Sequence, residues 1–200
     1  MKTSYRLPLL AILTVFAACN DSGKNSSSTS DSTANALLVK SELPYQAPPF
    51  NKIKDTDFKP AFEAGMKEHL SQINKIASNP EAPSFDNTLV AMEKSGELLN
   101  RVNNVFNTLT GANTNDDLQK LQEEVAPKLA AHQDAIYLNT QLFKRIEDIY
   151  GKRSTLKLDP ESAKLIEYYY QTFELAGAKL NDSDKTSLKK LNEQEASLSA

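Results

Sequence analysis

The sequence predicts an all-α protein, an antiparallel array of several helices. The 200 residues contain six glycines and no tryptophan, and residues that favour helices, such as Ala, Leu, Glu, Lys and Gln, are frequent. Apolar residues also recur at intervals of three and four, as they do on the buried face of a helix. The hydrophobic content of 40% is enough for a single core.

The first eighteen residues are typical of an export signal, so they are set apart from the fold. Lys2 and Arg6 are followed by an apolar run from Leu7 to Ala18, which is too short to span a bilayer. The run ends in small residues before Cys19, the only cysteine. This pattern resembles a bacterial lipobox, and the alternative is ordinary cleavage that removes an unpaired thiol. We expect a lipoprotein signal peptide at 1–18 and lipidation of Cys19.

A flexible tether is expected at 19–42. The tract from Asn20 to Asn35 is rich in Ser, Thr, Asn and Asp and has no apolar side chain larger than alanine. Such a tract cannot bury enough surface to offset the entropy lost on ordering. The folded body is therefore expected to start near Leu43 and to occupy 43–200.

Prolines, caps and apolar spacing predict the helix boundaries within this body. Gly111 is expected to end the second helix as a left-handed cap, Thr114 to open the third, and Pro127 to kink or split it. Ser183 is expected to open a last helix whose pattern still runs at Ala200, so we expect the chain to be a fragment. The expected helices are 55–78, 88–110, about 114–136, 140–152, 160–180 and 183 onward.

No catalytic motif is found in the sequence. Zinc peptidases commonly place two histidines four residues apart on one helix, beside a glutamate. Here the only two histidines, His69 and His132, are far apart in the chain, so we expect them to be isolated and structural or exposed, with no metal site. No Gly-x-Ser-x-Gly elbow occurs, and Cys19 lies in the export signal, so no catalytic residue is expected. A net charge of −3 without a basic cluster argues against nucleic acid as a partner.

Three consecutive tyrosines, Tyr168, Tyr169 and Tyr170, form the most unusual local pattern. Neighbouring residues on a helix point about 100° apart, so at most two of the three share a face. The simplest interpretation is core packing with one tyrosine at the rim. The alternative is that one of them lines a peptide channel, where its hydroxyl would bond a substrate backbone.

Several stretches of the body match a known family. They are LPYQAPPFNKI from Leu43, PAFEAGM from Pro60, FDNTLVAMEKSGELLNRVNNVF from Phe85, NTNDDLQ from Asn113, APKLAAHQDAIYLNTQLFKRI from Ala126 and ELAGAKL from Glu174. In these stretches the chain resembles the N-terminal helical region of the thimet oligopeptidase family of zinc metallopeptidases. Its peptidyl-dipeptidase (dipeptidyl carboxypeptidase) branch is the most similar, and oligopeptidase A comes next.

The resemblance implies a mostly helical, two-lobed peptidase with a deep channel, in which zinc is bound by a His-Glu-x-x-His helix and a downstream glutamate. Zinc polarises the peptide carbonyl and activates water in such enzymes. The N-terminal helices of the family form part of the channel wall, and its zinc motif lies far beyond position 200. No catalytic or metal residue is therefore carried over, and zinc is expected only in the full-length family.

Three alternatives of different classes follow from these patterns. The first is the non-catalytic N-terminal segment of an exported peptidase that removes C-terminal dipeptides from oligopeptides. The alternative is a stand-alone helical lipoprotein that binds peptides or a protein partner without hydrolysis, and a purely structural remnant is a third possibility. The expected location is the bacterial cell envelope, with the membrane as a partner through the lipid anchor.

Overall fold

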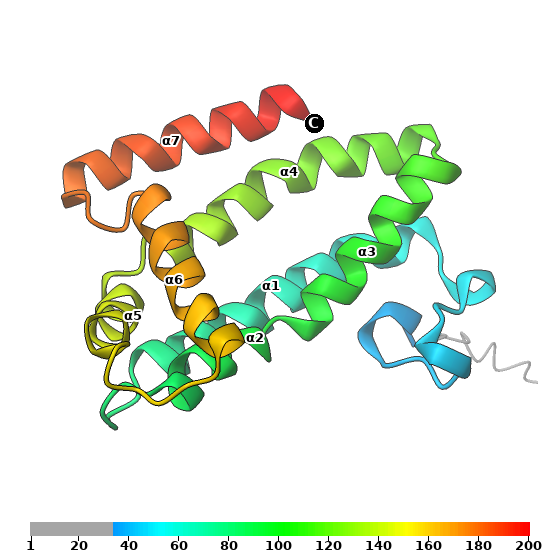
Figure 1. The fold of residues 1–200 in the computed structure, drawn as a ribbon. Helices are drawn as coiled ribbons and strands as arrows, with labels where there is room; N and C mark the ends of the chain where they lie inside the picture. Colours follow the sequence, from blue (N-terminus) through cyan, green and yellow to red (C-terminus); the bar gives the residue numbers. More distant parts are fainter. Residues whose placement is uncertain (1–33) are drawn as a thin grey trace, which may run out of the picture. The chain divides into compact units, whose positions relative to one another are not determined.

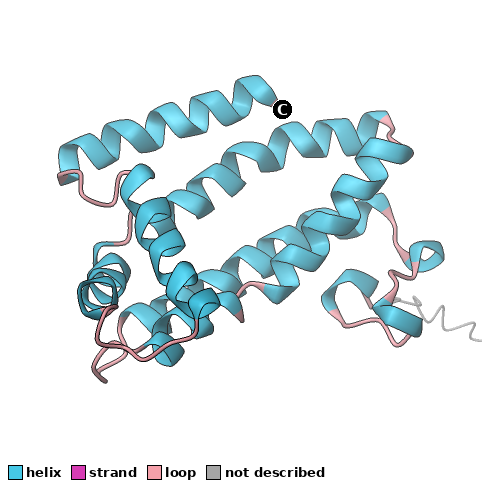
Figure 2. Ribbon diagram, in the orientation of Figure 1, coloured by secondary structure: helices cyan, strands magenta, loops and turns pink. Residues whose placement is uncertain are grey.

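The computed structural model describes residues 34–200. The expected signal peptide, the lipidation site Cys19 and most of the expected tether lie outside this range. Within it the chain is built from helices joined by short loops, and these residues contain no strand (Figure 2). The all-α prediction is confirmed. None of the helices in this range is long and apolar enough to cross a membrane.

Six longer helices make up most of the fold (Figure 1). They are α1 (Asp55–Ala77), α3 (Glu97–Ala112), α4 (Asp116–Tyr137), α5 (Thr140–Lys152), α6 (Pro160–Leu175) and α7 (Asp182–Ser199). Short turns precede or connect them: η1 (Ala36–Leu38), η2 (Pro44–Gln46), η3 (Phe50–Lys52), the π-helical η4 (Phe85–Val90) and α2 (Ala91–Glu93). Helix α1 packs against both α3 and α4, and α7 runs back along α4.

The buried apolar side chains form two separate clusters. The first, here called the front cluster, joins the N-terminal half of α1 to α3 and the start of α4. The second, the rear cluster, joins the C-terminal half of α1 to α2, α5 and α6. The front cluster contains Leu37, Phe58, Ala61, Phe62, Leu98, Leu99, Val102, Val105, Phe106, Leu118, Leu121 and Val125. The rear cluster contains Ile73, Ile76, Leu89, Met92, Ile136, Leu142, Phe143, Ile146, Ile149, Ile166, Phe173 and Ala178.

The packed body includes residues that the sequence placed in the tether. Leu37 is buried in the front cluster, and the guanidinium of Arg101 donates to its carbonyl oxygen at 3.1 Å. Asn35 caps η1 and donates to the carbonyl oxygen of Asp57 at 2.7 Å. A single large apolar residue beside a polar tract is enough to anchor it, so the expected start near Leu43 is too late.

Asparagine and aspartate side chains open the later helices. Asn115 accepts a hydrogen bond from the backbone N–H of Leu118, so the cap of α4 lies one residue after the expected Thr114. Asn181 accepts one from the backbone N–H of Asp184, so the cap of α7 lies two residues before the expected Ser183. Asp159 caps α6, with Pro160 in its first turn. Pro127 lies within α4 without splitting it. Packing of α4 against the front cluster outweighs the one backbone hydrogen bond that proline removes.

The expected second helix is interrupted at Gly96. This residue has φ of +72°, a left-handed conformation that glycine adopts without strain, and it separates α2 from α3. Gly111, the expected left-handed cap, lies inside α3 instead. A Cβ atom at Gly96 would lie 2.9 Å from the ring of His69, whereas one at Gly111 would meet nothing within 4 Å.

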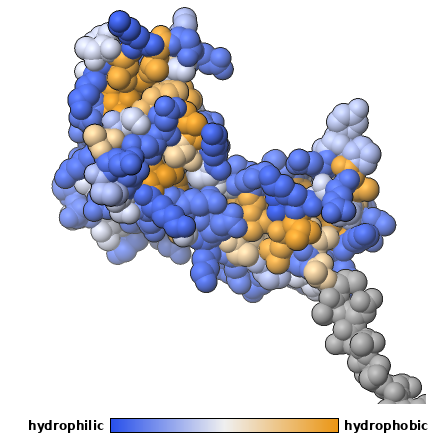
Figure 3. Space-filling view, turned by 90° about the horizontal axis from the view of Figure 1, so that it is seen from below, coloured by the Kyte–Doolittle hydropathy of each residue, from blue (hydrophilic) through white to orange (hydrophobic). Residues whose placement is uncertain are grey.

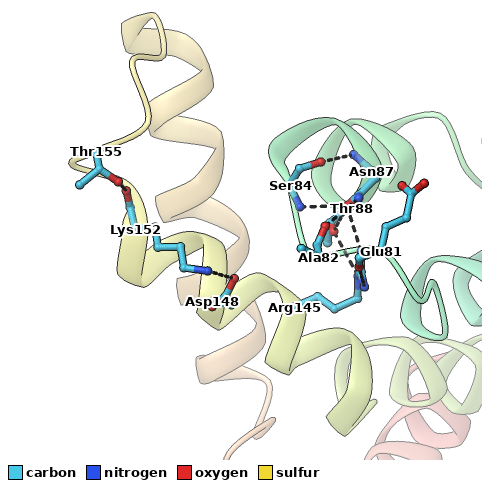
Figure 4. Close-up of polar contacts among 9 residues, drawn as sticks. All are labelled: Glu81, Ala82, Ser84, Asn87, Thr88, Arg145, Asp148, Lys152 and Thr155. Carbon is cyan, nitrogen blue, oxygen red and sulfur yellow. Dashed lines mark hydrogen bonds and ion pairs between the residues drawn. The ribbon is translucent and has the colours of Figure 1, made fainter.

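A buried arginine fixes the loop between α1 and η4 (Figure 4). Arg145 on α5 is 6% exposed. Its guanidinium donates to the carbonyl oxygens of Asn79 and Glu81, at 2.8 and 3.1 Å. It also donates to Asn87 Oδ1 at 2.9 Å and Thr88 Oγ1 at 3.3 Å. Every acceptor that it contacts is neutral, so its role is to satisfy the loop rather than to pair with an acid.

Helix α7 is attached to the C-terminal end of α4 by a second buried cation. Lys185 is 7% exposed, and its ammonium group donates to the carbonyl oxygen of Leu138 at 3.2 Å and to Thr140 Oγ1 at 3.0 Å. A positive charge at this position also complements the negative end of the α4 dipole. Further along α7, Asn192 donates to Asp134 Oδ1 at 2.7 Å.

Replacing Arg145 is expected to destabilise the protein strongly. Arg145→Met leaves several loop acceptors without donors, and the free energy of unfolding should fall by about 3 kcal/mol or more, since each buried unsatisfied group costs about 1–3 kcal/mol. Arg145→Lys should lose less than Arg145→Met, because an ammonium group still donates to some of these acceptors, although to fewer than a guanidinium does. Urea denaturation measures both. The control is Lys144→Met, which alters an exposed cation next in sequence; an equal loss there would contradict the role given to Arg145.

Adding a methyl group at Gly96 should also be destabilising. Gly96→Ala forces a left-handed alanine, at about 1–2 kcal/mol, and presses on the His69 ring. Gly111→Ala is the matched control, because it adds the same methyl group in open space within a helix and should stabilise by roughly 0.5–1 kcal/mol. The midpoint temperature of thermal unfolding should therefore fall for Gly96→Ala and rise for Gly111→Ala. A Gly96→Ala protein as stable as the wild type would show that the left-handed turn is not required.

Candidate functional site

Two histidines that are distant in sequence meet between α1 and α4. His69 Nδ1 lies 3.0 Å from His132 Nε2, within hydrogen-bonding distance, and the ring centroids are 5.0 Å apart. His132 is 5% exposed, and His69 is partly buried. The expectation of two isolated histidines is therefore wrong. Both interrupt an apolar stripe, and the packing of the two stripes against each other brings the rings into contact.

A serine extends this contact to the turn between α2 and α3. His69 Nε2 lies 3.2 Å from Ser95 Oγ, and the Ser95 hydroxyl donates to the carbonyl oxygen of Met92 at 2.6 Å. Beside it, the Gly96 N–H donates to Gln72 Oε1 on α1 at 2.7 Å. The left-handed turn at Gly96 allows the chain to pass this close to the His69 ring.

The hydrogen bonds specify which ring nitrogens carry protons. The Ser95 hydroxyl has one proton and gives it to Met92, so His69 Nε2–H donates to Ser95 Oγ. A neutral His69 then accepts at Nδ1, and His132 Nε2–H is the donor. His132 Nδ1 is left as a bare acceptor, and this atom is buried without a partner.

These polar residues form a layer between the two apolar clusters. On α1, His69 lies between Phe62 of the front cluster and Ile73 of the rear cluster. On α4, His132 lies between Val125 and Ile136, which belong to the same two clusters. Ser95 likewise separates Met92 from Leu98. The layer containing His69, Ser95 and His132 is here called the histidine layer.

Two small recesses open onto the histidine layer. Their volumes are about 210 and 220 Å³, and they share His69, Asn100, Ile136 and Tyr137. The first also includes Glu93 and Tyr169, and Tyr169 Oη donates to Glu93 Oε1 at 2.6 Å. The second adds the amides of Asn103 and Gln133. The walls combine amide, phenol and imidazole groups, which can hydrogen-bond a small polar ligand or a short stretch of peptide backbone.

Burial sets the ionisation of the groups around the recesses. It lowers the pKa of His69 below its usual value of 6.5. Burial, followed by the neighbouring His69, lowers the pKa of His132 to about 4. Burial also raises the pKa of Tyr137 and of Tyr169, and the hydrogen bond to Glu93 raises the latter further. At neutral pH the histidines and tyrosines of the site are therefore uncharged.

The three consecutive tyrosines enter different surroundings. Tyr168 is 57% exposed. Tyr169 lines the first recess and donates a hydrogen bond to Glu93 there. Tyr170 stacks on Tyr150, with ring centroids 3.8 Å apart, and accepts a hydrogen bond from Lys179. Only Tyr169 belongs to the candidate site. The assignment of these tyrosines to a channel wall stays a prediction.

Neither nucleophilic nor zinc chemistry fits the histidine layer. Ser95 contacts a histidine, but its hydroxyl is buried and its proton is committed to a backbone carbonyl, so it is not available as a nucleophile. The facing nitrogens of His69 and His132 are engaged in a hydrogen bond with each other. Among residues 34–200, no group of three or more His, Cys, Asp or Glu side chains is arranged as metal ligands would be.

The sequence comparisons find relatives with a named activity. The chain is 47% identical over 168 residues to a dipeptidyl carboxypeptidase of Escherichia coli (strain K12), covering 84% of this chain and 25% of that protein. It is also 47% identical over 166 residues to a dipeptidyl carboxypeptidase of Salmonella typhimurium, covering 83% of this chain and 24% of that protein. No protein-family model matches the chain.

The chain spans about a quarter of the length of these curated relatives. Identity of 47% across most of the described helices supports common ancestry rather than a chance similarity of composition. The family resemblance predicted from LPYQAPPFNKI and the later stretches is thereby confirmed, and this chain is a relative of the bacterial dipeptidyl carboxypeptidases of the thimet oligopeptidase family.

Proposed function

We propose that this chain provides the non-catalytic, N-terminal helical part of an exported peptidase that removes dipeptides from the C-termini of oligopeptides. The observation that carries the proposal is the 47% identity to two dipeptidyl carboxypeptidases over more than four fifths of the chain. In this role the helices form part of the wall that confines the peptide, and zinc and the residues that bind it belong to the remaining three quarters of such an enzyme.

The surface of the described helices is compatible with a larger assembly. Apolar side chains gather in separate patches on an otherwise hydrophilic surface (Figure 3). Among the large apolar side chains that are exposed, one group lies before α1, and another, of leucines, lies on or after α6 and on α7. The first comprises Leu38, Val39, Leu43, Tyr45 and Phe50, and the second Leu175, Leu180, Leu191 and Leu198. Exposed apolar patches of this kind typically mark interaction surfaces.

The same patches support the second candidate, a lipoprotein that binds peptides or a protein partner without hydrolysis. The two candidates differ in whether these helices can replace their counterparts in an active peptidase. A binding protein would retain its fold and its exposed patches, but it would be under no constraint to fit a catalytic lobe.

A chimera tests the peptidase assignment. The aligned 168 residues of the Escherichia coli relative are replaced by their counterparts from this chain, and release of C-terminal dipeptides is measured. We expect the chimera to be active, and the same chimera with Arg145→Met to be inactive because its loop no longer holds. The 200-residue chain alone should release no dipeptide. A folded but inactive chimera would favour the binding lipoprotein, and hydrolysis by the chain alone would contradict the non-catalytic role.

Membrane anchoring through Cys19 is the second part of the proposal. It is supported by Lys2 and Arg6, the apolar run that follows them and the small residues before the cysteine. Durable attachment needs more than one acyl chain, which a triacylated cysteine provides. We expect Cys19→Ser to move the protein from the membrane fraction to the soluble fraction. Ser28→Ala, a change in the adjacent tract, should leave it in the membrane fraction. Unchanged membrane partitioning of Cys19→Ser would contradict lipidation.

A further inference from the structure

The two apolar clusters meet at a hydrogen bond that depends on protonation. We propose that the hydrogen bond between His69 and His132 is a latch between α1 and α4, which holds the front and rear clusters together while both rings are neutral and opens when the rings take up protons. The inference is independent of the peptidase assignment, because it uses only the geometry of the histidine layer.

Neither ring can accept a proton without cost in this geometry. A proton added to His69 Nδ1 removes the acceptor that His132 Nε2–H needs, at a separation of 3.0 Å. A proton added to His132 Nδ1 keeps the hydrogen bond but places a charged N–H at a buried atom that has no partner. A second proton then sets two cations side by side. The rings therefore titrate as a coupled pair: burial opposes the first proton, and the second breaks the hydrogen bond, because Nδ1–H of His69 and Nε2–H of His132 then face each other.

The acidic side chain that lines one of the recesses, Glu93, is already engaged in a hydrogen bond with Tyr169. The titratable groups that line the recesses with His69 are Glu93 of α2, Tyr137 of α4 and Tyr169 of α6. The Glu93 carboxylate accepts a hydrogen bond from the Tyr169 hydroxyl at 2.6 Å, and the polar side chains that α3 contributes are the amides of Asn100 and Asn103.

Asp134 faces away from the pair. It lies two positions, or about 200°, around α4 from His132, and it contacts Asn192 of α7. Its carboxylate is therefore not placed to neutralise a proton on either ring.

The direction of the pH effect follows from the neutral state of the pair. Burial depresses both histidine pKa values in the folded protein below the unfolded value near 6.5. The unfolded or opened form then binds more protons, so the stabilisation is complete above about pH 6.5 and is lost as the pH falls toward 4. The first segments to loosen should be those that carry the layer: the middle of α1, the turn at Ser95 and Gly96, and α4 around His132.

Hydrogen exchange on the full chain at pH 7 and pH 5, corrected for the intrinsic pH dependence of exchange, tests the latch. We expect protection of the amides around His69 and His132 to fall by at least about tenfold at pH 5, the effect of one pKa unit of proton linkage. His132→Gln supplies an amide donor at the place of Nε2 without a titrating ring, and its protection should change much less with pH. Gln119→His is the matched control, because it adds an exposed imidazole to the same helix.

The outcomes separate the latch from general acid sensitivity. An equal pH response in wild type and His132→Gln, or a loss spread evenly over α5 and α6, would overturn the proposal. Nuclear magnetic resonance of the wild-type imidazoles gives a second measurement if His132→Gln does not fold, since the chain has only two histidines. Two coupled titration steps below pH 6.5 support the latch, and two independent titrations near 6.5 contradict it.

Discussion

Two imidazoles in contact at the crossing of α1 and α4 impose the main constraint on this fold. A polar group away from water must find a partner, and here each partner comes from a different part of the chain: α1 supplies His69, α4 supplies His132, and the α2–α3 turn supplies Ser95. The left-handed conformation of Gly96, which has no Cβ atom to strike the ring, completes the arrangement. Moving α1 breaks the hydrogen bonds to both other elements, and moving α4 or the α2–α3 turn breaks its bond to His69.

Much of the helical architecture could be predicted from the sequence, because burial follows local periodicity. Phe58, Phe62 and Ile73 belong to a stripe of three- and four-residue spacing, and all three are fully or almost fully buried on α1. The extent of α1 and α5 matches the sequence expectation closely. The break at Gly96 did not follow from the pattern, because the apolar stripe continues through it and its conformation depends on the His69 ring. The burial of Leu37 is likewise set by contacts with residues that are distant in the chain.

The candidate site was largely inaccessible to sequence reasoning. Motif searches test for side chains that are close in sequence, and His69 and His132 are brought together only by the packing of α1 on α4. One signal was available: each histidine lies on the buried stripe of its helix, in line with Phe62 and Ile73 or with Val125 and Ile136. A histidine on an apolar stripe needs a hydrogen-bonding partner, so two such histidines in one small protein are candidates for each other.

Arg145 has a consequence for which sequence changes the loop before η4 can tolerate. Two of its four acceptors are main-chain carbonyl oxygens, at Asn79 and Glu81, and every amino acid offers this group. The other two are side-chain oxygens of Asn87 and Thr88. Substitutions at 79 and 81 therefore leave these acceptors in place, while those at 87 and 88 that lack a side-chain oxygen remove one. Loop length is restricted even where side-chain identity is not, because an insertion would carry both carbonyls out of reach of a guanidinium that α5 holds in place.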